Sequence, residues 1–147
     1  MPTMHDTGVA TSIRARVASL RPDSPRQWGK MSIDQMLWHV NLPLRESLGE
    51  YPTPAPNVPL PKALFRWMIL TFPWGKSAPT RPDMKVVGTR YDFEVEKKSC
   101  LHMIDRFMAR PMDGPWPRSA NMGEMQGKHW SKLHFKHLDH HLRQFGA

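Results

Sequence analysis

The chain has 147 residues, a formal net charge of +8 and a single cysteine. This length suits one domain, residues 1–147, with a sizeable core, and a lone cysteine excludes a disulfide framework. The longest apolar stretch, 63–72, is too short to cross a bilayer, and the N-terminus lacks the apolar core of a signal peptide. We therefore expect a cytoplasmic protein with no membrane partner.

The positive charge raises the question of a nucleic-acid partner. The basic residues are scattered, however, with no run longer than Lys97-Lys98 and no nucleic-acid-binding motif. A generally basic, solvated surface explains this distribution better. A basic nucleic-acid-binding protein is therefore kept only as an alternative function.

Two helices are predicted in the N-terminal third of the chain. Apolar residues recur at spacings of three and four between 6 and 20, where Asp6 or Thr7 can cap the helix. The second helix has the clearer start, because Ser32 and Gln35 have the spacing of a capping box. Gly49 is expected to end it. Its inward stripe consists of Ile33, Met36, Leu37, Val40, Leu44 and Leu48.

His39 lies on this second helix, where the apolar stripe gives way to the polar face. Pro43 has no N–H for the His39 carbonyl, so we expect the helix to bend there. Such irregularity often marks a functional site, although a harmless kink explains it equally well. Glu46, two turns after His39, is expected to be solvated, the alternative being a base or acceptor beside a site. Trp28, just upstream, is expected to close the end of the bundle.

A long connection follows, from about residue 50 to 90. It contains a short apolar helix, 61–72, with Pro61 suited to its first turn. Trp67 and Trp74 are expected to anchor the core or the loops. The alternative is that they cover a site or a dimer surface.

A further helix is predicted over 91–108, and Cys100 lies on its apolar stripe. We therefore expect a buried, unreactive thiol. No convincing strand is found. Four main helices joined by long loops predict an all-α fold, a helical bundle.

The last helix, 128–145, carries the most distinctive pattern. On a helical wheel, with about 100° per residue, one side of this helix contains Trp130, His134, His137, Leu138, His141 and Phe145. The opposite side contains Lys132, Lys136, Asp139 and Arg143. His137 and His141 are spaced i, i+4, the spacing by which a helix offers two nitrogens to one metal ion. Because the motif is not HExxH, a zincin-type metalloprotease is excluded.

Buried, neutral core histidines are the alternative explanation of this stripe. Each such imidazole needs a hydrogen-bond partner for its N–H, which makes three on one stripe harder to explain. His134 fits either a hydrogen-bonding neighbour of a metal site or a core residue. His140, on the flank of the stripe, is expected to be a surface histidine.

Two segments carry a family resemblance. MSIDQMLWHV on the second helix, paired with KHLDHHLRQFG on the last, resembles the DinB-like superfamily of bacterial four-helix bundles. The stretches RPDSPRQWGKMS and DFEVEKKSCLHMIDRF look more narrowly like one branch of unknown function. The resemblance covers nearly the whole chain.

This resemblance implies a four-helix bundle with a long crossover connection, here with a short extra helix, and frequent homodimers. It also implies a divalent metal held by three histidines, which map onto His39, His137 and His141. Some relatives use low-molecular-weight thiols in transferase or isomerase reactions, but no thiol-binding motif is visible here. Zinc or nickel is the leading candidate for the ion, with copper, iron and manganese as alternatives.

Three imidazoles leave a divalent ion with open positions for water or a small-molecule substrate, which is the catalytic arrangement. We therefore expect a divalent-metal-dependent enzyme, with thiol-dependent transfer or isomerisation as one form of its chemistry. A non-catalytic, metal-binding dimeric bundle is the alternative of another class, beside the nucleic-acid-binding protein.

Overall fold

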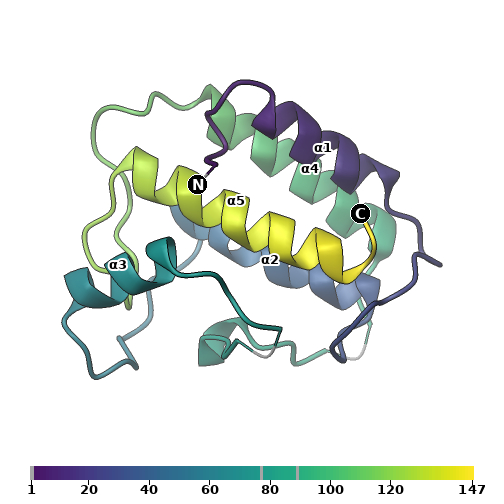
Figure 1. The fold of residues 1–147 in the computed structure, drawn as a ribbon, viewed down its shortest axis with the longest axis horizontal. Coiled ribbons are helices and arrows are strands. Elements are labelled where there is room, and N and C mark those ends of the chain that lie inside the picture. The colour runs from purple at the N-terminus through teal and green to yellow at the C-terminus, as the bar shows by residue number, and fades with distance from the viewer. Residues whose placement is uncertain (1, 77, 89) are drawn as a thin grey trace.

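The computed structural model describes residues 2–76, 78–88 and 90–147. The helices of this part are α1 (Val9–Ser19), α2 (Ile33–Ser47), α3 (Lys62–Thr71), the 3-10 helix η1 (Pro82–Met84), α4 (Phe93–Ala109) and α5 (Gly127–Gln144). The four long helices pack together, and α3 lies to one side of them (Figure 1). The prediction of an all-α fold is confirmed, and the packing of the four long helices is compatible with the predicted bundle. None of the helices in the described part combines the length and apolar character that crossing a bilayer requires.

Helices α2 and α5 are antiparallel neighbours. His39, in the first half of α2, lies against His137, whereas Ser47 at the end of α2 lies against His134, one turn earlier on α5. The prediction that the second and last helices pack together is confirmed. This pairing brings the histidines of two distant segments to the same level of the bundle.

Helices α2 and α4 run parallel to each other. Asp34 accepts a hydrogen bond from the backbone N–H of Tyr91, just before α4, and Asn41 donates to Glu96, which lies further along the chain in the same direction as Asn41 does on α2. Parallel neighbours cannot be joined by a tight turn. The connection from α2 to α4 is accordingly long and contains α3 and η1. Helix α1 lies beside α4 and α5. The paired contacts are Arg14 with Asp105, Lys97 with the carbonyl of Leu20 at the end of α1, and Arg16 with Asp139.

The predicted capping box of α2 is confirmed. The Ser32 hydroxyl accepts from the Gln35 N–H, and the Gln35 side chain accepts from the Ser32 N–H. Caps of this kind contribute about 1 kcal/mol to stability. The helix continues through Pro43 without interruption.

The predicted start of the first helix is wrong. Helix α1 begins only at Val9, and Gly8, with a φ of 79°, occupies its N-cap without a side-chain hydrogen bond. Asp6 does not cap the helix, because its carboxylate accepts from the Thr3 N–H in the preceding turn. The other helices lie within one or two residues of the predicted bounds.

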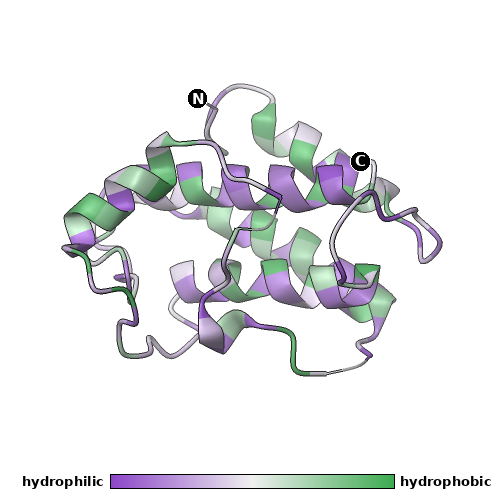
Figure 2. Ribbon diagram, turned by 60° about the horizontal axis from the view of Figure 1, so that its bottom comes forward, coloured by the Kyte–Doolittle hydropathy of each residue, from purple (hydrophilic) through white to green (hydrophobic). Residues whose placement is uncertain are grey.

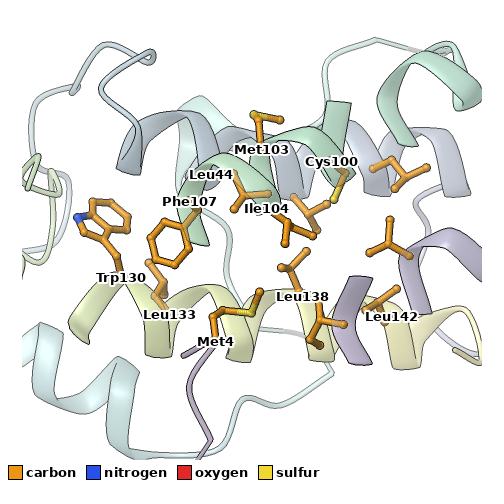
Figure 3. Close-up of a cluster of buried hydrophobic side chains, with 14 of the residues drawn as sticks. Met4, Leu44, Cys100, Met103, Ile104, Phe107, Trp130, Leu133, Leu138 and Leu142 are labelled. Atoms are coloured by element: carbon orange, nitrogen blue, oxygen red, sulfur yellow. The ribbon is translucent and has the colours of Figure 1, made fainter. Parts of the chain in front are cut away.

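The core lies between the four long helices, and Figure 3 shows side chains of α4 and α5 meeting there. Phe107 and Trp130 are fully buried, and so is Cys100. Burial raises the pKa of the Cys100 thiol to about 12, so the thiol is protonated at neutral pH. The prediction of a buried Cys100 is confirmed.

Helix α3 is fixed to α5 by Lys136, which the helical wheel had placed on the polar face. Its ammonium donates to the carbonyls of Ile69 and Phe72, both at 2.6 Å, and the residue is only 7% exposed. The last carbonyls of a helix lack intrahelical partners and attract a cation. The wheel was wrong here because α3 covers that side of α5.

The outer face of α3 remains apolar and exposed (Figure 2). Trp67 is 55% exposed and meets only the ring of Phe72 edge to face among the described ring contacts. The expectation that Trp67 anchors the core is therefore wrong. Trp74 does serve as an anchor, because its indole N–H donates to the Ile69 carbonyl.

Candidate metal centre

Three histidines converge where α2 faces the C-terminal half of α5. His39, His137 and His141 each offer a ring nitrogen, and these atoms all lie within 4.8 Å of one another. The ring centroids are 4.8–4.9 Å apart and the rings are nearly perpendicular. The three residues are 5%, 9% and 8% exposed, respectively. The predicted convergence of these side chains is confirmed.

Hydrogen bonds fix the tautomer of two of the three rings. The Nδ1 of His39 lies 2.9 Å from the Met84 carbonyl, which can only accept, so Nδ1 carries the proton. The Nδ1 of His141 lies 2.9 Å from the Gln144 Oε1, and the Gln144 amide is oriented by donating its NH₂ group to the Trp28 carbonyl. In both neutral rings the Nε2 therefore has a free lone pair.

The Nε2 atoms of His39 and His137 are 2.9 Å apart. Two bare lone pairs would repel at this distance, so either a proton or a metal ion must lie between them. Without an ion, His137 donates its Nε2 proton to His39. Two nitrogens bound to one ion at about 2.0–2.1 Å lie about 2.9–3.4 Å apart for bond angles of about 90–109°. The observed spacing of this pair already fits a shared ion.

Burial lowers the pKa of all three imidazoles. For His141 the pKa falls to about 3, with the nearby His39 as a further cause, and for His137 it falls well below 6.5. Burial also lowers the pKa of His39, against the hydrogen bond to Met84. The rings are therefore neutral at neutral pH, as metal coordination by imidazole requires.

The segment around η1 holds His39 in place. The carbonyl that orients His39 belongs to Met84, and Arg81 at the start of this segment binds both carboxylate oxygens of Glu46 on α2. Arg81 also donates to Asp83 at 2.6 and 2.9 Å. Hydrogen bonds to the second nitrogen of a ligand histidine commonly orient it for the metal.

The expectation of a solvated Glu46 is wrong. Its side chain is 2% exposed, and burial raises its pKa, although Arg81 opposes that shift. The ion pair with Arg81 makes this burial tolerable, since a buried charge needs a partner. Glu46 therefore links α2 to the segment that orients His39, rather than facing solvent.

The three histidines face a cavity of about 480 Å³. It lies between α2 and α5 on one side and the long connection on the other, with Phe65, Ile69 and Trp74 among its apolar walls. The Trp74 ring lies 6.0 Å from that of His137. Trp74 therefore covers the site as well as anchoring a loop, the alternative that the sequence had left open.

His140 is not the surface histidine that the wheel predicted. It is 9% exposed, its ring lies 5.0 Å from that of His141, and it lines the cavity. The reason is that Trp28 and Trp74, from two different loops, pack on it at 5.8 and 6.1 Å. Trp28 was expected to close the end of the bundle. In the structure it also contacts the wall of the site.

His134 is a core residue. It is 1% exposed, and its Nε2 lies 2.8 Å from the Ser47 hydroxyl. Its ring stacks on Trp130 and meets Phe107 edge to face. Of the two roles left open for it by the sequence, the structure favours the core.

Sequence reasoning missed three groups around the site: the Gln144 amide, the Met84 carbonyl and the Arg81 guanidinium. Gln144 follows His141 by three residues on one helix, and that spacing could have identified it. Arg81 and Met84 carry no comparable local signal, because they lie in the long connection and reach α2 only through the tertiary fold.

Comparison with known proteins gives a family but no activity. No curated protein and no solved structure matches this chain. A family model, described as a protein of unknown function (DUF1569), matches residues 6–147. Since this match covers nearly the whole chain, the protein belongs to the DUF1569 family.

Proposed function

We propose that this protein is a divalent-metal-dependent enzyme that acts on a small molecule, with His39, His137 and His141 as the metal ligands. The observation that carries the proposal is the convergence of three neutral ring nitrogens within 4.8 Å of one another at the wall of a cavity. Three protein nitrogens leave coordination positions open, which distinguishes catalytic from closed structural sites.

The chain's own groups have separable tasks in this proposal. Met84 and Gln144 hold protons on the Nδ1 atoms of His39 and His141, which leaves both Nε2 atoms free to bind. To bind an ion through Nε2, His137 would have to carry its proton on Nδ1 instead of on the Nε2 that faces His39. When bound, a divalent ion would acidify a water or a thiol in the cavity. The all-nitrogen ligand set suits zinc or nickel, with copper, iron and manganese as alternatives.

The resemblance to the DinB-like superfamily supports the same ligand set. It also suggests a low-molecular-weight thiol as co-substrate in a transfer or isomerisation reaction, and a homodimer. We include the thiol chemistry in the proposal as its narrower form. The exposed apolar face of α3, with Leu64, Trp67 and Phe72, is a surface that a homodimer could cover.

A non-catalytic metal-binding bundle is the second candidate. The burial of all three histidines favours it, because storage and sensing need only a stable, enclosed ion. The adjoining cavity of about 480 Å³ favours the enzyme, since a mere ion carrier needs no such space.

The decisive experiment is a zinc and nickel titration of protein purified without an affinity tag. We expect one ion per chain in the wild type and none at the same concentrations in His141→Ala. Equal affinity in the two proteins would refute the site. A screen of the metal-loaded protein with low-molecular-weight thiols and electrophiles then separates the enzyme from the carrier, because only the enzyme turns over.

A further inference from the structure

The cavity beside the three histidines has an unbalanced charge. Among the described residues that line it, Lys30, Lys76 and Arg81 are cationic, and Glu46 is the only carboxylate. Arg81 is already matched by Glu46 and by Asp83. Lys30 and Lys76 form no ion pair within the described part of the chain. No carboxylate there neutralises their charges.

A bound ion would enlarge this imbalance. Arg81, Glu46 and Asp83 together carry one negative charge, and the two lysines add two positive charges. A divalent ion on the histidines adds two more, which leaves an excess of three positive charges around one cavity. Walls of low polarity strengthen such a field and raise the local concentration of anions.

The position of Lys76 connects the lysines to the metal site. Its ammonium lies 5.0 Å from the Trp28 ring, and that ring lies 5.8 Å from His140, the neighbour of His141. Lys76 is therefore held at the side of the cavity that the histidines occupy. The remaining walls are largely apolar and include Met31, Val58, Phe65, Ile69, Met122 and Leu133.

We infer that the ligand of this cavity is a small amphipathic organic anion, with its charged group at Lys30 and Lys76 and its apolar body against the wall formed by α3 and α5. This inference rests on the proposed function only in that one end of the ligand would reach the metal. The lysines determine the sign of the ligand's charge, and the histidines determine where its reactive end lies.

The first test uses zinc-loaded, full-length protein and two probes that differ in one charge. Suberic acid monohydroxamate carries a metal-binding hydroxamate and a carboxylate, and its methyl ester lacks the carboxylate charge. We expect calorimetry to show that the acid binds about tenfold more tightly than the ester, the order given by two partly exposed ion pairs. Equal affinities would overturn the inference.

Variants assign the preference to the two lysines. In Lys30→Gln/Lys76→Gln the acid should lose its advantage, while the affinities for zinc and for the ester stay unchanged. The control Lys98→Gln/Lys128→Gln makes the same change in net charge at two exposed positions outside the cavity. A preference that survives in the first variant, or disappears in the control, would overturn the inference.

A metal-free version keeps the two proposals separable. In His39→Ala, octanoate and 1-octanol can be compared through the fluorescence of Trp28 and Trp74 near the cavity. We expect octanoate to bind more tightly, and Lys30→Gln/Lys76→Gln in this background to abolish the difference. Failure of zinc to bind the wild type would refute the metal site alone, whereas equal binding of octanoate and octanol would refute the anion preference.

Discussion

His134 and His141 lie two turns apart on one stripe of α5, yet their surroundings differ in one decisive respect. They are 1% and 8% exposed, and burial lowers the pKa of each to about 3. His134 has its Nε2 on the Ser47 hydroxyl and its ring against Trp130 and Phe107. His141 instead has its Nδ1 on Gln144, with its Nε2 lone pair free beside two other histidines.

Burial and pKa therefore do not separate a core histidine from a candidate metal ligand. The separating property is which ring nitrogen has a partner and what the other nitrogen faces. In the first half of α5, His134 packs in the aromatic core. In the second half, His141 lines the cavity. Experiments that treat the two halves differently test this distinction.

The largest expected effect is on metal affinity. His39→Ala, His137→Ala and His141→Ala should each weaken zinc binding by about a thousandfold or more, because each removes a direct nitrogen ligand. His134→Ala should change zinc affinity by less than about threefold, since its nitrogen bonds Ser47. His140→Ala, one residue from His141, is the matched control and should also cost little. Calorimetric titration of the five variants would show whether the three converging histidines differ from His134 and His140.

The same variants should reverse their order when the free energy of unfolding is measured in a chelator. His134→Ala should lose about 2–4 kcal/mol, because it leaves a cavity in the core and removes the hydrogen bond to the Ser47 hydroxyl. His141→Ala should stay within about 1 kcal/mol of the wild type, since it borders a cavity and removes a polar ring that is costly to bury. Urea denaturation measures both. Similar losses of unfolding free energy in both variants would contradict the distinction between a core histidine and a site histidine.

A smaller effect should follow from releasing the segment that orients His39. Arg81→Gln should weaken zinc binding by about 10- to 100-fold, the range typical of groups that orient a ligand. Arg21→Gln serves as the control, because it removes an exposed arginine that forms an ion pair with Asp23 far from these groups in the sequence. The double variant Glu46→Gln/Arg81→Met removes the buried Glu46 charge together with its partner, and Asp83 keeps the hydrogen bond from the Tyr51 hydroxyl, so its loss of affinity cannot come from an unpaired Glu46 carboxylate. Unchanged affinity in the folded double variant would show that Met84 needs no such support.

The smallest effect concerns the pH dependence of stability. The pKa of His134 is about 3 in the folded protein and about 6.5 when unfolded. Between these values the unfolded chain binds more protons, so acidification below pH 6.5 destabilises the fold by up to about 1.4 kcal/mol per pH unit.

His134→Gln should lack this contribution to the pH dependence of stability. Urea denaturation from pH 7 to pH 4.5 in a chelator should show a shallower slope for the variant, and parallel slopes would contradict a neutral, buried His134. His5 is the titratable neighbour to monitor, because it also lowers this pKa.

The sequence by itself determined the local features of this protein. The recurrence of apolar residues at three and four predicted the helices, because a helix buries one stripe. The Ser32–Gln35 pair predicted the start of α2, because a capping box requires only neighbouring residues. The i, i+4 spacing placed His137 and His141 on one face, and the family resemblance added His39 to them.

The tertiary structure alone decided what covers each face. Lys136 lies on the polar side of α5 and His140 on its flank, and a wheel cannot show that α3, Trp28 and Trp74 pack there. Glu46 is buried for the same reason, since its partner Arg81 lies 35 residues further along the chain. The local sequence determines the helix face on which a side chain lies. The residue that packs against that side chain depends on how the long connection between α2 and α4 folds back onto the other helices.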